Sequence, residues 1–457
     1  MGELTFRGGV HPREMKELSC EMPLIPYAPK GDLVIMTNQH IGKPATAVVA
    51  KGDHVLAGQL IAEASGFVSA NIVSPVSGTV KAVEMRPTVM GSMAQAIVIT
   101  SDGENTMAEG VGTKCSYKDL TNQEILDRVK AAGIVGMGGA GFPTHVKLTV
   151  KEPEKIRYII ANGAECEPYI TCDDQLMRTK AAEIVEGIEI ILRLFPRAEG
   201  VVCIENNKPG AIAAMCQACQ GHGRIRVQPL KTKYPQGGER SLISVVAGRH
   251  LKLGMLPADA GCVVDNVATI HAIYRAVSLN TPLMERSVTV SGESVQNPGN
   301  FWVKIGTSCQ ELVDACGGWK EGMEPEKILC GGPMMGIPMT GLDFPICKNN
   351  NAITALPVDP VSAATMTACL RCGRCNRVCP LGLSPQLMQV AARNKDYERY
   401  EKRLYGLECI ACGCCTYICP AKRPLMQLFK TTKAEIMATP KEISRNARPA
   451  RAGFMML

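Results

Sequence analysis

The cysteines towards the C-terminal end have the spacing that says most about chemistry in this chain of 457 residues. Residues 369–380 read C-x2-C-x2-C-x3-C-P, and residues 409–420 repeat the pattern. Three closely spaced thiolates bind three corners of one [4Fe–4S] cluster, and the fourth cysteine of such a motif usually ligates the other cluster. The pattern therefore predicts two [4Fe–4S] clusters. The first is assigned to Cys369, Cys372, Cys375 and Cys419, and the second to Cys409, Cys412, Cys415 and Cys379, which leaves Cys414 over.

Zinc is the alternative ligand for four thiolates, but two complete motifs that each end in Cys-Pro favour iron–sulfur clusters. The remaining cysteines are scattered, and none completes a set of four, so we interpret them as small buried hydrophobes. With 21 cysteines and no apolar leader at the start of the chain, we expect a reducing compartment and no signal peptide.

A glycine-rich loop, residues 136–144, contains G-x-G-x-x-G. It does not fit a Rossmann fingerprint, because it follows a predicted helix and continues into Phe-Pro. Glycines nevertheless let backbone N–H groups approach a phosphate or a flat ring closely, and Lys147 follows within reach of a phosphate. The alternative is a plain tight turn.

Composition excludes several classes of function. Aromatic residues make up only 4% of the chain, which argues against a stacking surface for single-stranded nucleic acid. No apolar run approaches the roughly 18 residues of a membrane span. Residues 369–457 carry 16 Lys/Arg and 6 Asp/Glu, a net of +10, so the remainder of the +7 chain has a net of −3. The basic end is either a solvated tail or a surface that docks on an acidic partner or an anionic membrane.

The pattern of elements indicates several modules. Short strands fill residues 30–100, with a pattern similar to biotinyl and lipoyl carrier domains, but residues 65–70 lack the lysine that a carrier needs. Residues 113–280 alternate helices and strands, which predicts an α/β layer with a largely parallel sheet. Thr121 and Glu124 form a potential capping box, and Gly133 ends the helix behind it. Residues 285–345 indicate a small α+β module, and residues 384–407 a helical segment with Ser384 as N-cap.

Several segments resemble the flavoprotein subunit that oxidises NADH in respiratory complex I. These are the glycine loop, Asn162-Gly-Ala-Glu165-Cys-Glu167-Pro168, Gly237-Gly238-Glu239 and Val264-Asp-Asn266-Val. The resemblance implies that they hold FMN and bind NAD(H) upon it. Met137 and Ala164 depart from it, since complex I has Arg and Asp at these places. From these departures we expect a change in how tightly flavin or nucleotide is held. The residues implied to bind these cofactors are Gly136, Gly138, Gly139, Ala140, Gly141, Phe142, Lys147, Asn162, Gly238, Glu239 and Asn266.

Nearly the whole chain resembles a second family, the C subunits of the Rnf complex. The segments that carry this resemblance include FRGGVHP, GIVGMGGAGFPTHVKL, YPQGGER, SGESVQNPGN and CLRCGRCNRVCP. It implies an electron-transfer subunit that exchanges hydride with NAD(H) through FMN and passes single electrons through two clusters. In the whole complex this is coupled to ferredoxin oxidation and Na⁺ or H⁺ translocation. It further implies a peripheral position on the cytoplasmic face of the cell membrane, with other membrane and iron–sulfur subunits as partners and ferredoxin as an indirect one. Glu165 and Glu167 would act near the nicotinamide ribose and flavin, and their alternative role is ordinary loop solvation.

The expected fold is accordingly multidomain α/β. It comprises a barrel-sandwich domain over residues 1–112, an FMN- and NAD(H)-binding α/β domain over 113–282, an SLBB β-grasp module over 283–345, a helical ferredoxin-type domain over 346–435 and a basic tail over 436–457. Two alternatives stay open. One is a protein similar to cobalamin reductases, in which the carrier-like domain follows the cluster domain. The other is a structural adaptor that has lost flavin.

The paired motifs predict about eight iron atoms and as much acid-labile sulfide per chain in anaerobically purified protein. Metal analysis together with electron paramagnetic resonance of the reduced protein checks this. Iron near four atoms, with one magnetically isolated centre, would contradict the assignment of two clusters.

Overall fold

The computed structural model describes residues 2–252 and 254–438, and the chain in it divides into two compact units. Unit 1 comprises residues 1–6 and 11–363, and unit 2 comprises residues 7–10 and the chain from Ala364 onward. Most of the expected basic tail, with Lys441, Arg445, Arg448 and Arg451, lies outside the described residues. No helix in the described ranges has the length and apolar character needed to cross a membrane.

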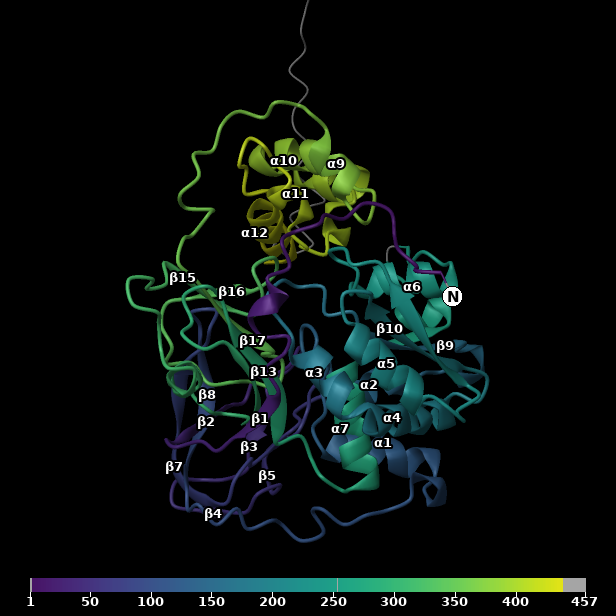
Figure 1. Cartoon of the computed structure of the whole chain (residues 1–457), viewed down its shortest axis with the longest axis vertical. Coiled ribbons are helices and arrows are strands. Elements are labelled where there is room, and N and C mark those ends of the chain that lie inside the picture. Colours follow the sequence, from purple (N-terminus) through teal and green to yellow (C-terminus); the bar gives the residue numbers. More distant parts are fainter. Residues whose placement is uncertain (1, 253, 439–457) are drawn as a thin grey trace, which may run out of the picture. The chain divides into compact units, whose positions relative to one another are not determined.

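The N-terminal module of unit 1 is a pair of small antiparallel sheets (Figure 1). One has the order β2 (Leu33–Met36), β8 (Met93–Ser101), β7 (Gly78–Pro87), β4 (His54–Val55), and the other β3 (Thr46–Ala47), β5 (Leu60–Glu63), β6 (Ile72–Val73). Alternating apolar side chains from both sheets, such as Ile35, Ile61 and Ile97, fill the space between them. This is the barrel sandwich expected from the sequence.

The second module has a four-stranded parallel sheet, as the alternating pattern predicted. Its order is β11 (Ile225–Leu230), β10 (Glu199–Glu205), β9 (Tyr158–Gly163), β12 (Cys262–Asn266). One face packs against α1 (Asn122–Ala131), α4 (Ala181–Leu194), α5 (Pro209–Ala218) and α7 (Val267–Ser278), and the other against α6 (Glu239–Ala247). The expected capping box is confirmed: Thr121 accepts from the Glu124 amide while Glu124 accepts from Thr121.

A third sheet has six strands in the order β1 (Leu24–Tyr27), β14 (Gly299–Lys304), β13 (Glu285–Ser291), β17 (Ala352–Leu356), β15 (Lys327–Cys330), β16 (Ile337–Met339). Helix α8 (Cys309–Ala315) packs against this sheet. Two of the strands, β1 and β17, come from outside the expected 283–345 segment. All five side chains of β17 are buried, so this strand needs cover on both faces and lies inside the sheet, not in the cluster unit.

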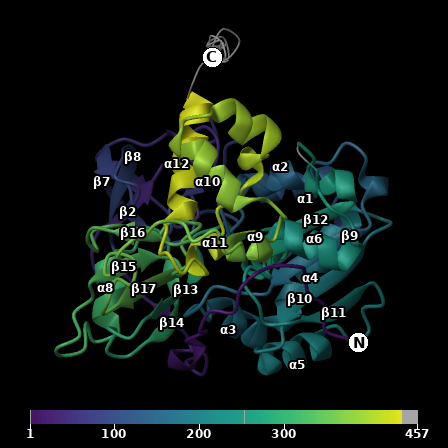
Figure 2. The same ribbon diagram turned by 90° about the horizontal axis from the view of Figure 1, so that it is seen from above.

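Unit 2 is helical, with α9 (Arg374–Val378), α10 (Pro385–Arg393), α11 (Cys414–Tyr417) and α12 (Leu425–Ala438), seen as green and yellow ribbons in Figure 2. Helix α10 begins at Pro385 as expected, although Ser384 makes no side-chain cap. The predicted helical segment 384–407 is interrupted: α10 ends at Arg393, and a π-helical turn follows at Arg399–Arg403.

Two buried basic side chains, Lys348 and Arg286, join the modules of unit 1. The Lys348 ammonium donates to the carbonyl groups of Asn71 in the barrel sandwich and Gly133 at the end of α1, at 2.6 Å each. Arg286 donates to the carbonyl of Lys348 at 2.6 Å and to that of Met137 in the glycine loop at 3.3 Å. Gly133 is required here, because a Cβ at this position would collide with the Asn71 carbonyl oxygen. The place of the glycine loop therefore depends on Lys348 and Arg286.

Replacing Lys348 by Met should lower the free energy of unfolding by about 2–4 kcal/mol, because two buried carbonyls lose their donor. Burial lowers the pKa of Lys348 to about 7, so above pH 7 the unfolded chain holds a proton that the folded chain has released. The wild type therefore gains stability from pH 7 to about 10, where an exposed lysine titrates, and the variant lacks this gain.

Thermal unfolding of both proteins across that pH range measures the difference, with exposed Lys118→Met as the matched control. A difference between wild type and Lys348→Met that is flat or shrinks as pH rises would contradict the role given to Lys348.

Candidate functional site

The two cysteine loops of unit 2 share one backbone conformation. Arg371 and Ala411 precede the second cysteine of each motif, and both have a φ of +53°. The glycines that follow that cysteine, Gly373 and Gly413, are also left-handed, and a short helix begins directly after each. A non-glycine residue adopts this conformation at an energetic cost. Its recurrence at matched positions indicates that both loops are shaped for the same kind of ligand.

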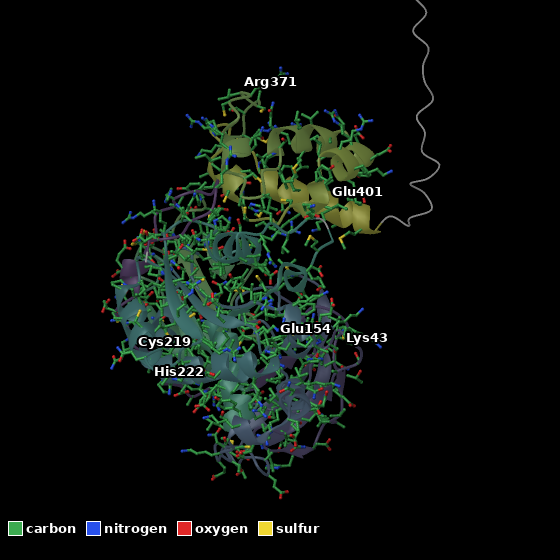
Figure 3. All side chains as sticks on the ribbon, turned by 90° about the vertical axis from the view of Figure 1, so that its right-hand side faces the viewer. Lys43, Glu154, Cys219, His222, Arg371 and Glu401 are labelled. Carbon is green, nitrogen blue, oxygen red and sulfur yellow. The ribbon has the colours of Figure 1, made fainter. Side chains whose placement is uncertain are left out.

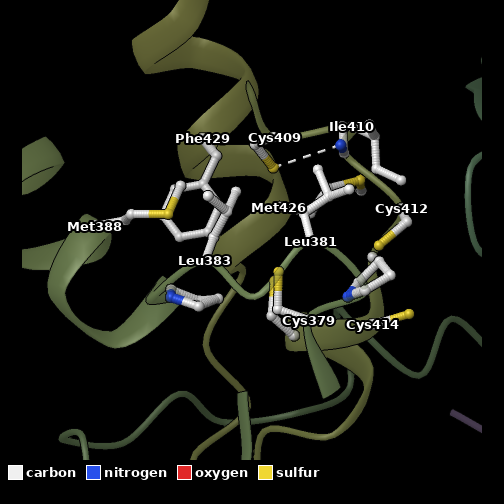
Figure 4. A pocket seen from close by; sticks show the side chains of 15 residues that line it. Cys379, Leu381, Leu383, Met388, Cys409, Ile410, Cys412, Cys414, Met426 and Phe429 are labelled. Carbon is white, nitrogen blue, oxygen red and sulfur yellow. Dashed lines mark hydrogen bonds between the residues drawn. The ribbon is translucent and has the colours of Figure 1, made fainter. Parts of the chain in front are cut away.

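The thiols of the second motif line one pocket together with a cysteine of the first motif (Figure 4). Cys409, Cys412 and Cys415 surround it, and Cys379 enters from the first motif. Apolar side chains, among them Leu383 and Phe429, line it as well. The leftover Cys414 lines the same pocket, is fully buried and hydrogen-bonds to Cys412.

The other four expected ligands are more open. Cys369 and Cys372 are exposed, and Cys375 and Cys419 are half-buried. Burial raises the pKa of the Cys375 thiol, and the nearby Cys419 and Cys369 raise it further. Cys419 thus lies near enough to Cys375 to raise the pKa of its thiol, and Cys379 lines the pocket of the second motif.

This donor set fits an iron–sulfur cluster. Burial raises the pKa of Cys409 to about 11, and the neighbouring thiols Cys412 and Cys379 contribute. Several thiolates so close together repel one another unless a cation lies between them, and soft thiolate ligands favour iron–sulfur clusters and zinc.

The glycine loop closes on itself through the paired Val135 and Pro143, after which α2 (Thr144–Leu148) begins. Residues 138–140 are exposed, and a Cβ on Gly139 would meet nothing within 4 Å. Gly138 lies against Asn266, where a Cβ would come within 2.9 Å. The Met137 side chain is only 3% exposed and packs in the core, so this departure from the complex I pattern points away from the exposed part of the loop.

The other cofactor-binding residues expected from the sequence gather around this loop at the carboxyl end of the parallel sheet. Asn162 and Asn266 are paired at the ends of β9 and β12. The side-chain amide of Asn266 donates to the main-chain carbonyl of Asn162 at 3.4 Å. The Asn162 side chain donates to the Gly237 carbonyl at 2.9 Å, which brings in the start of α6 with Gly238 and Glu239. Ligands of open α/β sheets bind at this end of the strands.

Lys147 forms an ion pair with Asp265 at 3.1 Å and donates to the Val264 carbonyl at 2.7 Å. Burial alone would lower its pKa, but Asp265 and Glu239 outweigh this and raise it. The lysine therefore stays charged beside the loop, with 23% of its side chain exposed.

The Glu165 side chain is buried and Glu167 is half-buried, and both are hydrogen-bonded to protein groups. The Glu165 carboxylate accepts from the amides of Asp173 and Asp174 at the start of α3 (Cys172–Thr179), and its backbone is left-handed. Burial raises the pKa of Glu165 to about 8 and that of Glu167 to about 7. Glu167 accepts from the Met334 amide, on the loop between β15 and β16.

Two buried lysines that the sequence did not single out hold this segment. Lys16 donates to the Glu167 and Ile170 carbonyls and lies 4.0 Å from the Glu165 carboxylate. Lys208 donates to the Ala164 carbonyl at 2.7 Å. A lysine in sequence carries no sign of whether it is buried, so only the contacts identify both.

Four family models match separate parts of the chain. They are the RnfC barrel sandwich hybrid domain over residues 4–104, the Nuo51 FMN-binding domain over 129–275, the SLBB domain over 287–338 and the 4Fe–4S dicluster domain over 364–420. The expected multidomain α/β architecture is confirmed, and so are FMN and 4Fe–4S clusters as its cofactor types.

Relatives resemble the chain over nearly its full length. The C subunit of the proton-translocating ferredoxin:NAD(+) oxidoreductase complex of Clostridium ljungdahlii is 44% identical, covering 94% of both chains. The C subunit of the Na(+)-translocating ferredoxin:NAD(+) oxidoreductase complex of Acetobacterium woodii is 40% identical over 95% of this chain and 97% of its own. The C subunit of the ion-translocating oxidoreductase complex of Rhodobacter capsulatus is 41% identical over 94% of this chain and 83% of its own.

The shared pocket predicts that Cys379→Ser perturbs the cluster of Cys409, Cys412 and Cys415 more than the cluster of its own motif. Paramagnetic resonance and Mössbauer spectra of the variant resolve the two centres. Cys414→Ser is the matched control, because Cys414 lines the same pocket but is not assigned as a ligand. Loss of the first motif's cluster with the second one intact would show that the ligands do not cross.

Proposed function

The chain belongs to the family of C subunits of Rnf-type ion-translocating ferredoxin:NAD⁺ oxidoreductase complexes, and from this we propose that it is the subunit that exchanges hydride with NAD(H) through FMN and passes single electrons through two [4Fe–4S] clusters. Ferredoxin oxidation and Na⁺ or H⁺ translocation are the coupled work of the whole complex. The observation that carries the proposal is the gathering of the glycine loop, Asn162, Asn266 and the Gly237–Glu239 turn at one sheet edge, in a chain that also holds two thiol sets.

FMN, when bound, supplies the conversion between two-electron hydride transfer and the one-electron steps of iron–sulfur clusters. The chain's own part is to hold and surround it. Backbone N–H groups of the exposed residues 138–140 are available to an anionic or planar ligand, since no Cβ fills the space at Gly139. The charged Lys147, fixed by Asp265, would face the negative charge of a phosphate. We propose that Gly136, Gly141, Phe142, Gly238 and Glu239 complete this site.

We propose for Glu165 and Glu167 a role beside the flavin and the nicotinamide ribose that follows from their burial. Glu165 fixes the start of α3 through two amides, and Glu167 fixes the loop before β16. Their raised pKa values, about 8 and about 7, allow both to hold or release a proton near neutral pH. They thereby set the charge of the segment that follows Asn162.

For the clusters we propose the crossed ligand sets, with Cys419 in the first and Cys379 in the second. The shared pocket of Cys379 with Cys409, Cys412 and Cys415 supports this. Thiolate charge, burial and hydrogen bonds to sulfur are what this chain can use to adjust the two reduction potentials.

The family relationship makes the chain one component of a complex of several subunits, as the names of its relatives indicate. We propose that it is peripheral, lies on the cytoplasmic face of the membrane and receives electrons from ferredoxin indirectly, through other iron–sulfur and membrane subunits. We further propose that the basic C-terminal end contributes to its attachment. The order of the four matched segments, with the barrel sandwich before the cluster domain, favours this family over cobalamin reductases.

Gly139→Val tests the flavin site. We expect loss of FMN, because the branched side chain occupies space where ligand must meet backbone, while iron is retained and the fold is undisturbed. The absorption spectrum, the iron content and NADH oxidation with ferricyanide are measured on the same preparation. Gly223→Val, at another glycine with open space around it, is the control and should keep FMN.

Full FMN in Gly139→Val would move the flavin site elsewhere. A wild-type spectrum with the cluster shoulder near 400 nm but no flavin bands would instead favour a flavin-free adaptor.

A further inference from the structure

The two cysteine loops have the same backbone conformation, but the first loop carries arginines on its surface and the second does not. At three matched positions the first loop has arginine where the second has an uncharged residue, and at a fourth both have an aliphatic residue. The matched pairs are Leu370 and Ile410, Arg371 and Ala411, Arg374 and Cys414, and Arg377 and Tyr417. Cluster binding alone does not demand arginine at these places, because the second loop reaches the same conformation without it.

The two loops also differ in how far their residues are exposed to solvent. All residues from Thr365 to Cys372 are exposed, and Leu370 is 66% exposed, whereas Cys412 and Cys415 in the second loop are buried. An exposed leucine between exposed thiols and arginines gives the first loop an apolar centre within a basic rim. This is the composition of a protein–protein contact, with few charges in the middle and charges around it.

The charge on this loop is not neutralised nearby. Residues 364–380 contain three arginines and no acidic residue. Within the described chain no carboxylate forms an ion pair with Arg371, Arg374 or Arg377. The Arg371 side chain projects from the loop into solvent (Figure 3). A surface of this kind attracts a partner with the opposite charge and increases its rate of association.

We propose that residues 366–377 form the docking face for an acidic electron-transfer protein, whose own redox centre meets the cluster held by Cys369, Cys372, Cys375 and Cys419. This rests on the proposed function, because it requires that cluster. In the transfer, one electron passes from the reduced centre of the partner to this cluster. The partner's centre is thereby oxidised by one electron and the cluster is reduced by one electron. No bond forms or breaks, and no proton is transferred. A redox partner would use the cluster ligands Cys369 and Cys372 that lie within this face, whereas an anionic membrane surface would not.

The test uses the full chain with both clusters. A reduced, strongly acidic two-cluster bacterial ferredoxin is the probe, and it stands in for the acidic iron–sulfur protein that passes electrons to this chain. The variant Arg371→Gln/Arg374→Gln/Arg377→Gln is compared with Arg393→Gln/Arg399→Gln/Arg403→Gln, which removes the same charge from exposed positions of the same unit. Stopped-flow absorption gives the second-order rate constant for cluster reduction, and surface plasmon resonance gives the affinity for oxidised ferredoxin. Only preparations with full iron content are compared.

We expect the loop variant to react about tenfold or more slowly at low ionic strength, to bind oxidised ferredoxin more weakly and to lose most of the salt dependence of the wild type. The control variant should behave as wild type. Equal slowing of both variants, an unchanged salt dependence in the loop variant, or loop-dependent binding to anionic vesicles in place of ferredoxin would each overturn the proposal. A chain that binds ferredoxin through the loop but does not oxidise NADH would leave the docking face standing and reject the proposed function.

Discussion

Lys348 and Arg286 are buried basic side chains whose hydrogen bonds go to backbone carbonyl groups of three modules. Removing such groups from water is costly, and the cost is offset only when each N–H meets an acceptor. The acceptors here are carbonyls at the ends of elements, at Gly133 after α1 and at Met137 inside the glycine loop, which have no partner within their own helix or sheet. The same contacts that satisfy these two side chains therefore position the loop against the barrel sandwich and the six-stranded sheet.

The proposed FMN and NAD(H) site depends on residues from more than one module. The matched FMN-binding segment covers residues 129–275, yet Lys16 comes from before it and Arg286 and the Met334 amide from after it. Lys16 and Lys208 hold the backbone of residues 164–170 by its carbonyl oxygens, which turns Glu165 inward despite its unfavourable φ. Burial of several carboxyl groups around two lysines then raises the pKa values of the carboxyl groups. Local strain and unusual protonation thus coincide at the proposed nucleotide site, where such features concentrate.

The cluster unit is held in shape in a different way from unit 1. Its two loops have little regular structure, and their shape comes from left-handed residues at fixed places around the cysteines. Each loop positions its thiols without a large apolar core, since metal binding itself contributes to the folding energy of such sites. The two loops are consequently free to differ on their outer surfaces. One is buried with apolar neighbours, and the other is exposed and basic.

The chain's sequence alone determined the two cluster motifs, the glycine loop, the parallel α/β module, the capping box at Thr121 and the order of modules, because each depends on spacing between near neighbours or on the period of apolar residues. Tertiary structure alone decided the burial of Lys16, Lys208, Arg286 and Lys348, the entry of β1 and β17 into the six-stranded sheet, and the inward turn of Met137 and Glu165. These outcomes depend on contacts between residues up to about 300 positions apart, such as Gln39 with Lys348. A sequence shows that a lysine carries a charge, but whether that charge meets water or a carbonyl is settled only when distant segments pack around it.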